Sequence, residues 1–263
     1  MKCSDRVFVV TGAGNGMGRE VALRLVRRGA HVAAADVDQA GLAGIAELTR
    51  GLRARLSTHV LDVTDGAAVA DFPEQVLDQH GRIDALVNIA GVIHRFAPFT
   101  DLSERETGRI MAVNFTGTVN MCRAFLPHLL TRPEANLTNM SSLSALLPFA
   151  SQTMYSASKG AVKLFSEGLY AELCDTNVHV TTVFPGNIST ELTRNSGVDM
   201  LDAGNKKIRS TTPEAAAAKI VDGIADNRFR VLIGADARAL DVLSRISARR
   251  ATRLVAKQIK SVL

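Results

Sequence analysis

The sequence predicts a single α/β domain in which a mostly parallel sheet carries helices on both faces. Short apolar runs alternate with longer amphipathic segments along most of the 263 residues, a pattern typical of parallel strands joined by crossover helices. The expected strands are Arg6–Thr11, His31–Asp36, Leu56–Asp62, Ala85–Ile89, Leu137–Ser141, His179–Phe184 and Arg230–Ile233. The expected helices include Met17–Arg28, Ala67–His80, Glu104–Leu130 and Tyr155–Cys174. No linker or repeat interrupts this pattern, so we expect one domain over residues 1–237.

The positive charge of the chain is concentrated near its C-terminal end. The net charge is +5, but residues 238–263 alone carry seven Lys or Arg against one acidic residue, Asp241. The other residues carry 24 basic and 25 acidic side chains. A nucleic-acid-binding domain would carry a basic face on its folded body, so we expect no nucleic-acid partner. Residues 238–263 are predicted to form a basic amphipathic helical tail, which either packs as a terminal helix or makes a weak contact with an anionic membrane surface.

Cysteine usage and the N-terminal residues point to the cytoplasm. The three cysteines are odd in number and far apart, so a disulfide framework is not expected. Asp5 and Arg6 stand where a secretory signal would have a long apolar run. The six histidines show no ligand spacing, so no metal site is expected either.

A glycine-rich loop follows the first expected strand and leads into a helix. It runs Thr11-Gly12-Ala13-Gly14-Asn15-Gly16-Met17-Gly18. Glycines allow the chain to turn sharply and to approach a pyrophosphate, whose charge then faces the helix N-terminus. This strand, loop and helix predict a Rossmann-like dinucleotide site.

Further polar residues follow the next three expected strands. Asp36 ends the second strand, where a carboxylate accepts hydrogen bonds from the adenosine ribose and repels a 2′-phosphate, so NAD is expected over NADP. Asp62, followed by Val63, ends the third strand and is placed to bond the adenine amino group. Asn88 ends the fourth. Ligands of such sheets bind at the carboxyl ends of the strands, so these residues are expected to share one cofactor site.

The chemical residues are expected at the start of a later helix. Tyr155 and Lys159 are four residues apart and so lie on one helix face. A free phenol has a pKa of about 10, and a nearby ammonium group would lower it enough for acid/base chemistry. Ser142 ends the preceding strand, where its hydroxyl could hold a substrate oxygen. Asn114 is a polar residue on an apolar helical face, either a satisfied buried amide or a group that positions a water near Lys159.

With these motifs in this order, the chain resembles the short-chain dehydrogenase/reductase family from about Arg6 to Gly234. The resemblance implies a doubly wound, seven-stranded sheet and assembly into a homodimer or homotetramer. It implies that Tyr155 is the proton donor or acceptor, that Lys159 lowers the tyrosine pKa and that Ser142 orients the substrate. It also implies that Asn114 anchors a water. The implied cofactor contacts are Gly12, Asn15, Gly16, Met17, Gly18, Asp36, Val37, Asp62, Val63, Asn88, Ala90, Gly91, Tyr155, Lys159, Pro185, Gly186, Ile188 and Thr190.

One residue departs from the family pattern. Ile89 stands where the family usually has a second Asn. Because Asn88 is retained, cofactor binding should survive, whereas a hydrogen bond that stabilises the central sheet is expected to be lost.

The substrate is indicated only by apolar residues near the chemical residues and by a long irregular segment, residues 187–212. These residues favour a lipophilic secondary alcohol or ketone of acyl, steroid or terpenoid type. They are Leu143, Leu146, Leu147, Pro148, Phe149, Met154, Leu192 and Met200. His94, after the fourth strand, also lies where substrate is expected. Two alternatives stay open: a non-catalytic dinucleotide-binding sensor or scaffold, and an NADPH-dependent ketoacyl-type reductase.

Overall fold

The computed structural model describes residues 1–52, 55–188 and 210–260. Within these residues one seven-stranded sheet has the order β3-β2-β1-β4-β5-β6-β7, with all of its pairs parallel. Its strands are β1 (Val7–Thr11), β2 (His31–Asp36), β3 (Leu56–Val60), β4 (Ala85–Asn88), β5 (Ala135–Met140), β6 (Val178–Pro185) and β7 (Arg230–Ile233). The seven expected strands are therefore confirmed, with ends that shift by one or two residues. The strand order reverses between β1 and β4, which is where open α/β sheets bind ligands.

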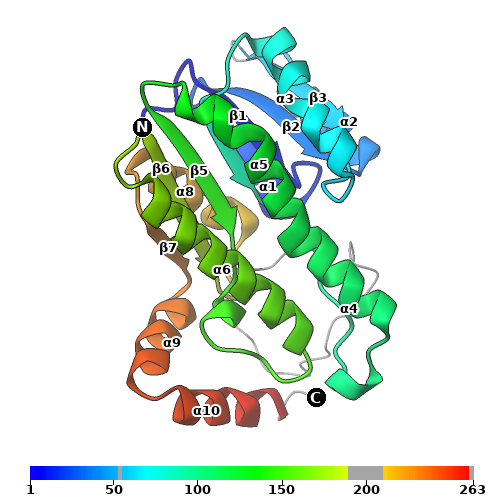
Figure 1. Ribbon diagram of the computed structural model, residues 1–263, viewed down its shortest axis with the longest axis vertical. Helices are drawn as coiled ribbons and strands as arrows, with labels where there is room; N and C mark the ends of the chain where they lie inside the picture. Colours follow the sequence, from blue (N-terminus) through cyan, green and yellow to red (C-terminus); the bar gives the residue numbers. More distant parts are fainter. Residues whose placement is uncertain (53–54, 189–209, 261–263) are drawn as a thin grey trace.

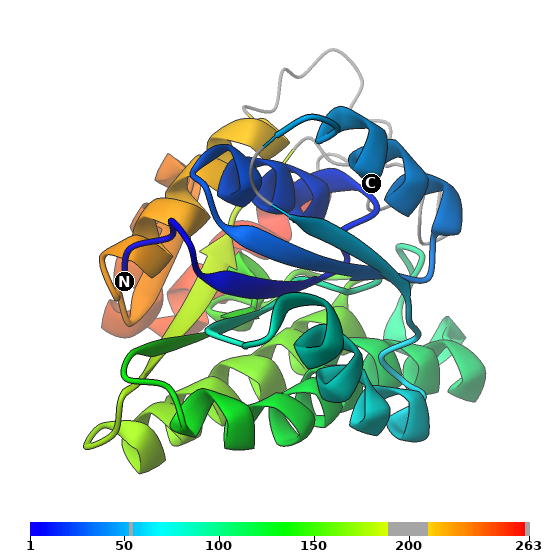
Figure 2. The same ribbon diagram turned by 90° about the horizontal axis from the view of Figure 1, so that it is seen from above.

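Two layers of helices cover the sheet (Figure 2). One layer contains α1 (Gly16–Arg27), α2 (Gln39–Leu48) and α8 (Pro213–Ala225), and the other contains α3 (Gly66–His80), α5 (Gly117–Leu130) and α6 (Thr153–Leu173). Side chains of β1 alternate between the layers: Phe8 and Val10 belong to the core under α1 and α8, and Val7 and Val9 to the core under α3 and α5. The sheet is thus buried on both faces, as a parallel sheet requires.

The helix that was expected over Glu104–Leu130 is interrupted. It consists of α4 (Glu104–Met111), a π-helical turn (Ala112–Thr116) and α5. The expectation of one regular helix was therefore wrong, because an apolar period close to 3.6 residues does not reveal one widened turn. Such turns are frequent at functional sites, and Asn114 lies within this one.

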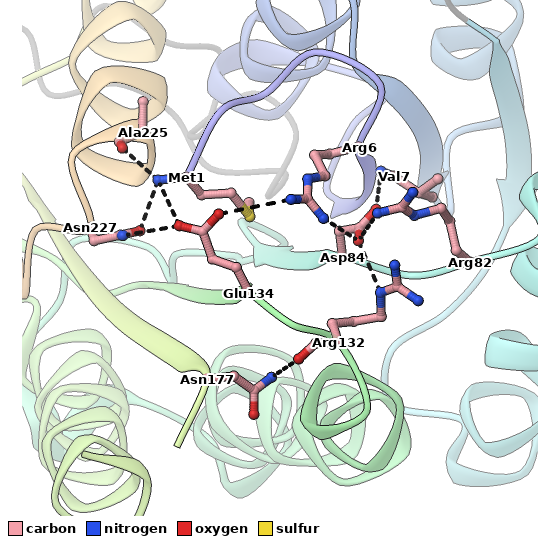
Figure 3. Close-up of polar contacts among 10 residues, drawn as sticks. All are labelled: Met1, Arg6, Val7, Arg82, Asp84, Arg132, Glu134, Asn177, Ala225 and Asn227. Atoms are coloured by element: carbon pink, nitrogen blue, oxygen red, sulfur yellow. Dashed lines mark hydrogen bonds and ion pairs between the residues drawn. The ribbon is translucent and has the colours of Figure 1, made fainter. Parts of the chain in front are cut away.

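A buried carboxylate joins the amino ends of three neighbouring strands (Figure 3). The side chain of Asp84 is completely buried and accepts hydrogen bonds from the Val7 amide (2.9 Å), Arg82 (2.7 Å), Arg132 (3.1 Å) and Arg6 (3.3 Å). Burial alone would raise the pKa of Asp84, but the bonds from Arg82 and Val7 overcome this effect and hold the pKa below its usual value. The cluster connects the chain just before β1, β4 and β5, at the edge opposite the glycine loop.

Two helices form the C-terminal end of the described chain. They are α9 (Ala235–Ile246) and α10 (Ala248–Lys260), and they lie beyond the carboxyl end of β5 (Figure 1). Ala251 and Val255 of α10 are buried against Leu147, while Arg249 and Arg253 are exposed. The apolar side of the tail thus packs on the segment that follows Ser142. No helix among the described residues combines the length and apolar character needed to cross a membrane.

We predict that Asp84→Asn lowers the free energy of unfolding by about 3–5 kcal/mol at pH 7, because it leaves three half-buried arginines without the buried carboxylate that they share. The folded pKa is lowered, so this contribution is present above the unfolded pKa of about 3.9 and is lost as the pH falls through the lower folded value. Urea unfolding from pH 7 to pH 3 measures it. Asp71→Asn, on the exposed side of α3, is the control. Equal stability of the two variants at pH 7 would contradict the prediction.

Candidate active site

The loop after β1 crosses the chain after β4 so closely that only glycine fits at two positions. Gly12 has φ +69°, and a Cβ there would lie 2.8 Å from the Ala90 amide nitrogen. A Cβ at Gly18 would lie 1.8 Å from the Gly12 carbonyl oxygen. Thr11 holds the crossing from the other side, because its Oγ1 accepts hydrogen bonds from the amides of Ile89 (3.1 Å) and Ala90 (3.2 Å).

The N-terminus of α1 faces the open side of this loop. Asn15 caps the helix by accepting a hydrogen bond from the Gly16 amide (2.8 Å), and no acidic residue occupies the first turn. Met17 packs its side chain against the core. The helix end therefore presents amide groups and the positive end of the helix dipole, which suit a pyrophosphate.

Asp36 is held in place by the chain around it. Its Oδ2 accepts a hydrogen bond from the Gly14 amide (2.9 Å), and its Oδ1 accepts one from the Asp38 amide (2.9 Å). Each carboxylate oxygen keeps further acceptor capacity for ribose hydroxyl groups. The next residue, Val37, is 65% exposed and carries no positive charge for a 2′-phosphate.

The chain that follows β3 adds a polar and an apolar wall. Asp62 is exposed, and only its Oδ1 is engaged, by the amide and the hydroxyl of Thr64. Val63 is buried beside Gly117, where a Cβ would come within 2.5 Å of the valine side chain. An exposed carboxylate beside an apolar residue fits the predicted contact with adenine.

The central sheet keeps a polar link despite Ile89. Asn88 donates to Asn139 Oδ1 (2.9 Å), and Asn139 donates to Ser166 of α6 (3.0 Å). Ile89 points instead into the apolar core with Met140 and is 9% exposed. A buried hydrogen bond from β4 to β5 is thus present directly before Ile89.

Tyr155, Ser142 and Lys159 come together where β5 ends and α6 begins. The Ser142 side chain lies close enough to the Tyr155 hydroxyl to act on its pKa. Burial raises the pKa of Tyr155, and the nearby Ser142 hydroxyl opposes that effect. Lys159 is 3% exposed and donates from Nζ to the Met140 carbonyl oxygen (2.9 Å), and burial lowers its pKa to about 8.

This electrostatic picture differs from the sequence-based expectation of a lowered tyrosine pKa. The spacing of Tyr155 and Lys159 placed them on one helix face but did not include the cost of burying the phenolate. In the folded protein without cofactor that cost dominates, and the ammonium group of Lys159 is engaged by Met140.

Asn114 connects the chain after β4 to α6. Its Oδ1 accepts from the Val92 amide (2.8 Å), and its Nδ2 donates to the Val92 carbonyl (3.0 Å) and to Ser158 (2.9 Å). A Cβ at Gly91 would lie 3.2 Å from both Asn114 Oδ1 and Lys159 Nζ. Glycine therefore allows Asn114 and Lys159 to approach one another. Both amide protons of the Asn114 side chain are thus donated within the protein.

Part of the predicted site follows β6. Pro185 ends that strand, and the Gly186 amide donates to the Ile233 carbonyl of β7 (2.8 Å). Ile188 pairs with Thr211 and packs on the apolar core. Three further predicted residues lie outside the described part of the chain: Thr190, Leu192 and Met200.

The sequence pattern of the short chain dehydrogenase family matches residues 6–201. The chain belongs to the short-chain dehydrogenase/reductase family. A Mycobacterium tuberculosis protein designated oxidoreductase SadH is 37% identical over 261 residues, which cover 95% of this chain and 94% of that protein. The 1-deoxy-11-beta-hydroxypentalenate dehydrogenase of Streptomyces avermitilis is 33% identical over 90% of this chain and 88% of its own length. A Burkholderia phymatum short-chain dehydrogenase/reductase solved in complex with NAD superposes with a TM-score of 0.83 at 25% identity, covering 97% of each chain.

In this short-chain dehydrogenase/reductase, the structure adds several polar residues near the site that the sequence did not predict. Asn139 and Ser158 link the catalytic segments, and Ser144 and Gln152 are 2% exposed beside Ser142 and Tyr155. Asn139 could have been found, because it is a polar residue within an apolar strand. The other three stand in polar surroundings of the sequence and give no such signal.

We predict that the free energy of unfolding of the cofactor-free protein increases with pH above pH 8 because of Lys159. The folded pKa of about 8 lies below the unfolded value of about 10.4. The unfolded chain therefore binds more protons between these values, and stability rises with pH by up to about 1.4 kcal/mol per unit. In urea unfolding from pH 7.5 to 10.5, Lys159→Met should lose this rise. Lys163→Met, one turn along the same helix, should keep it, and parallel slopes in all three proteins would refute the assignment.

Proposed function

We propose that this short-chain dehydrogenase/reductase uses NAD(H) to interconvert a secondary alcohol and a ketone, with Tyr155 as the acid/base. The family supports an enzyme that acts on CH–OH groups. The observation that carries the finer proposal is the placement of the Ser142 side chain beside the Tyr155 hydroxyl, on the helix that also carries the buried ammonium group of Lys159. The hydride would be supplied or accepted by the nicotinamide of the bound cofactor.

The residues divide the remaining work. Tyr155 has a raised pKa, so at neutral pH it carries a proton that it can donate to a ketone oxygen; in the reverse direction it takes the proton of the alcohol. Ser142 holds the same oxygen next to the phenol. Lys159 keeps positive charge beneath the site. Asn114 fixes Val92 and Ser158, and its main-chain carbonyl, which accepts from Thr118 (2.9 Å), is the group left to bind the predicted water.

Cofactor choice is proposed to follow from Asp36. Its carboxylate would repel a 2′-phosphate, and neither Asn15 nor Val37 beside it offers a compensating positive charge. This supports NAD and weighs against the NADPH-dependent ketoacyl-type reductase. An intact Ser142–Tyr155 pair weighs against a dinucleotide sensor, which needs no such pair.

The setting of the enzyme is part of the proposal. We infer a cytoplasmic homo-oligomer, supported by three free cysteines and by Leu164, 67% exposed on α6. A lipophilic substrate is supported by Leu143, which directly follows Ser142 and is buried. Residues 1–237 would form the catalytic domain and residues 238–263 a tail. Since Ala251 and Val255 pack within the chain, a weak membrane contact of the tail would use only its exposed basic side.

We predict that Tyr155→Phe lowers kcat by about 10²–10⁴-fold, the range of general acid/base catalysis, while NADH affinity stays within about twofold. Tyr170→Phe is the matched control. Tyr170 is the only other tyrosine of the chain, and it lies on the exposed side of the same helix. Absorbance of NADH over a panel of secondary alcohols and ketones gives kcat, and quenching of NADH fluorescence gives affinity. Substantial activity of Tyr155→Phe would remove the tyrosine from the chemistry.

We predict that the protein binds NADH at least about tenfold more tightly than NADPH, and that Asp36→Asn reduces this preference by removing the repulsive charge. Asp62→Asn, at the end of the neighbouring strand, should weaken both cofactors by the same factor. Calorimetric titration of both cofactors measures the ratio. Tighter binding of NADPH to the unaltered protein would show that Asp36 does not select the cofactor.

A further inference from the structure

Buried polar atoms without hydrogen-bond partners gather around the Ser142–Tyr155 pair. The described residues contain nine such side-chain atoms, and three of them belong to His94, Ser144 and Gln152. These residues are 4%, 2% and 2% exposed. Since buried polar groups are normally paired, this concentration calls for a partner that the protein itself does not provide.

The unpartnered atom of His94 is a hydrogen-bond acceptor. Its Nδ1 lies 2.6 Å from the Arg95 carbonyl oxygen, which can only accept, so Nδ1 carries the proton. In the neutral ring Nε2 is then a bare lone pair, and this is the buried atom without a partner. The segment is anchored by Arg95, which binds Glu106 (2.8 Å) and the Asp101 carbonyl.

The unpartnered atom of Gln152 is also an acceptor. Its Nε2 donates to the His94 carbonyl oxygen (2.9 Å). Because that oxygen cannot donate, the amide orientation is determined, and Oε1 is the atom left without a partner. His94 Nε2 and Gln152 Oε1 are both acceptors and cannot hydrogen-bond to one another. Each therefore requires a hydrogen-bond donor from elsewhere.

Both residues are attached to the catalytic pair. Gln152 immediately precedes α6, and its carbonyl accepts from the Ser156 amide (2.9 Å), one residue beyond Tyr155. The chain after His94 lies beside the residues that precede α6, because the Ala97 amide donates to the Ser151 carbonyl (3.2 Å). On the other side, the Ser144 amide donates to Ser142 Oγ (3.1 Å) and leaves its own hydroxyl without a partner.

We propose that His94 Nε2 and Gln152 Oε1 form an acceptor site that binds a second hydrogen-bond donor of the substrate, a hydroxyl or an amide N–H. The inference rests on the proposed function and deepens it: the substrate is an apolar alcohol or ketone that carries a further donor group. Leu143, directly after Ser142, adjoins its apolar part, and the acceptor site selects among lipophilic compounds. An analogue without the donor makes no hydrogen bond at either acceptor, and it binds more weakly for that reason.

The test compares cyclohexane-1,2-, 1,3- and 1,4-diols with their monomethyl ethers, which keep the reacting alcohol but lack the second donor. For at least one diol we expect a kcat/KM about ten- to a hundredfold above that of its ether, as loss of hydrogen bonds from a buried site implies. His94→Phe and Gln152→Met should reduce this ratio to near one, and His94→Gln should restore part of it. Gln75→Met, exposed on α3, should leave the ratio unchanged.

Calorimetric binding of the same compounds to the protein–NADH complex separates the two proposals. A diol preference in binding without turnover would overturn the proposed function and support the acceptor site. Turnover of diols and ethers with equal kcat/KM would support the proposed function and overturn the acceptor site. Equal binding of diols and ethers would overturn it as well. A ratio that survives in both His94→Phe and Gln152→Met would assign the selection to other residues.

Discussion

The polar contact between the end of β5 and helix α6 is the interaction on which the rest of the site depends. Asn139 donates to Ser166, Ser141 donates to the Lys159 carbonyl (2.8 Å), and Lys159 Nζ donates to the Met140 carbonyl. These bonds are buried, where an unmade hydrogen bond is costly. They determine how α6 lies on the sheet, and thereby where Tyr155 stands relative to Ser142.

The cofactor end and the chemical end are joined through the chain that follows β4. Its amides at 89 and 90 bond to Thr11 beside the glycine loop, and Val92 bonds to Asn114 in the π-helical turn. Asn114 continues to Ser158, whose hydroxyl donates to the Tyr155 carbonyl (2.8 Å). One short segment thus determines the spacing between the glycine loop and α6, and the proposed hydride transfer requires this spacing to be accurate.

Burial has opposite effects on the two titrating residues at the centre of the site. It raises the pKa of Tyr155 and lowers that of Lys159 to about 8, because each group is less easily charged in a medium of low polarity. The same environment leaves His94 and Gln152 with unused acceptors. The protein provides no hydrogen-bond donors for these two acceptors, and the proposed substrate would supply one. Burial thus underlies both the pKa shifts of Tyr155 and Lys159 and the proposed recognition of a second donor group.

The sequence by itself determined the features that depend on local chain properties. Short apolar runs between amphipathic segments located all seven strands, and Gly12 and Gly18 marked the sharp turn after the first of them. The ends of the strands placed Asp36, Asn88 and Ser142 on one edge of the sheet. Only the tertiary structure decided the widened turn at Asn114, the buried hydrogen bond between Asn88 and Asn139, and the unpaired acceptors of His94 and Gln152. The physical reason is that periodicity and backbone angles are set by near neighbours, whereas the partner and the desolvation of a buried polar group depend on residues that are distant in the sequence.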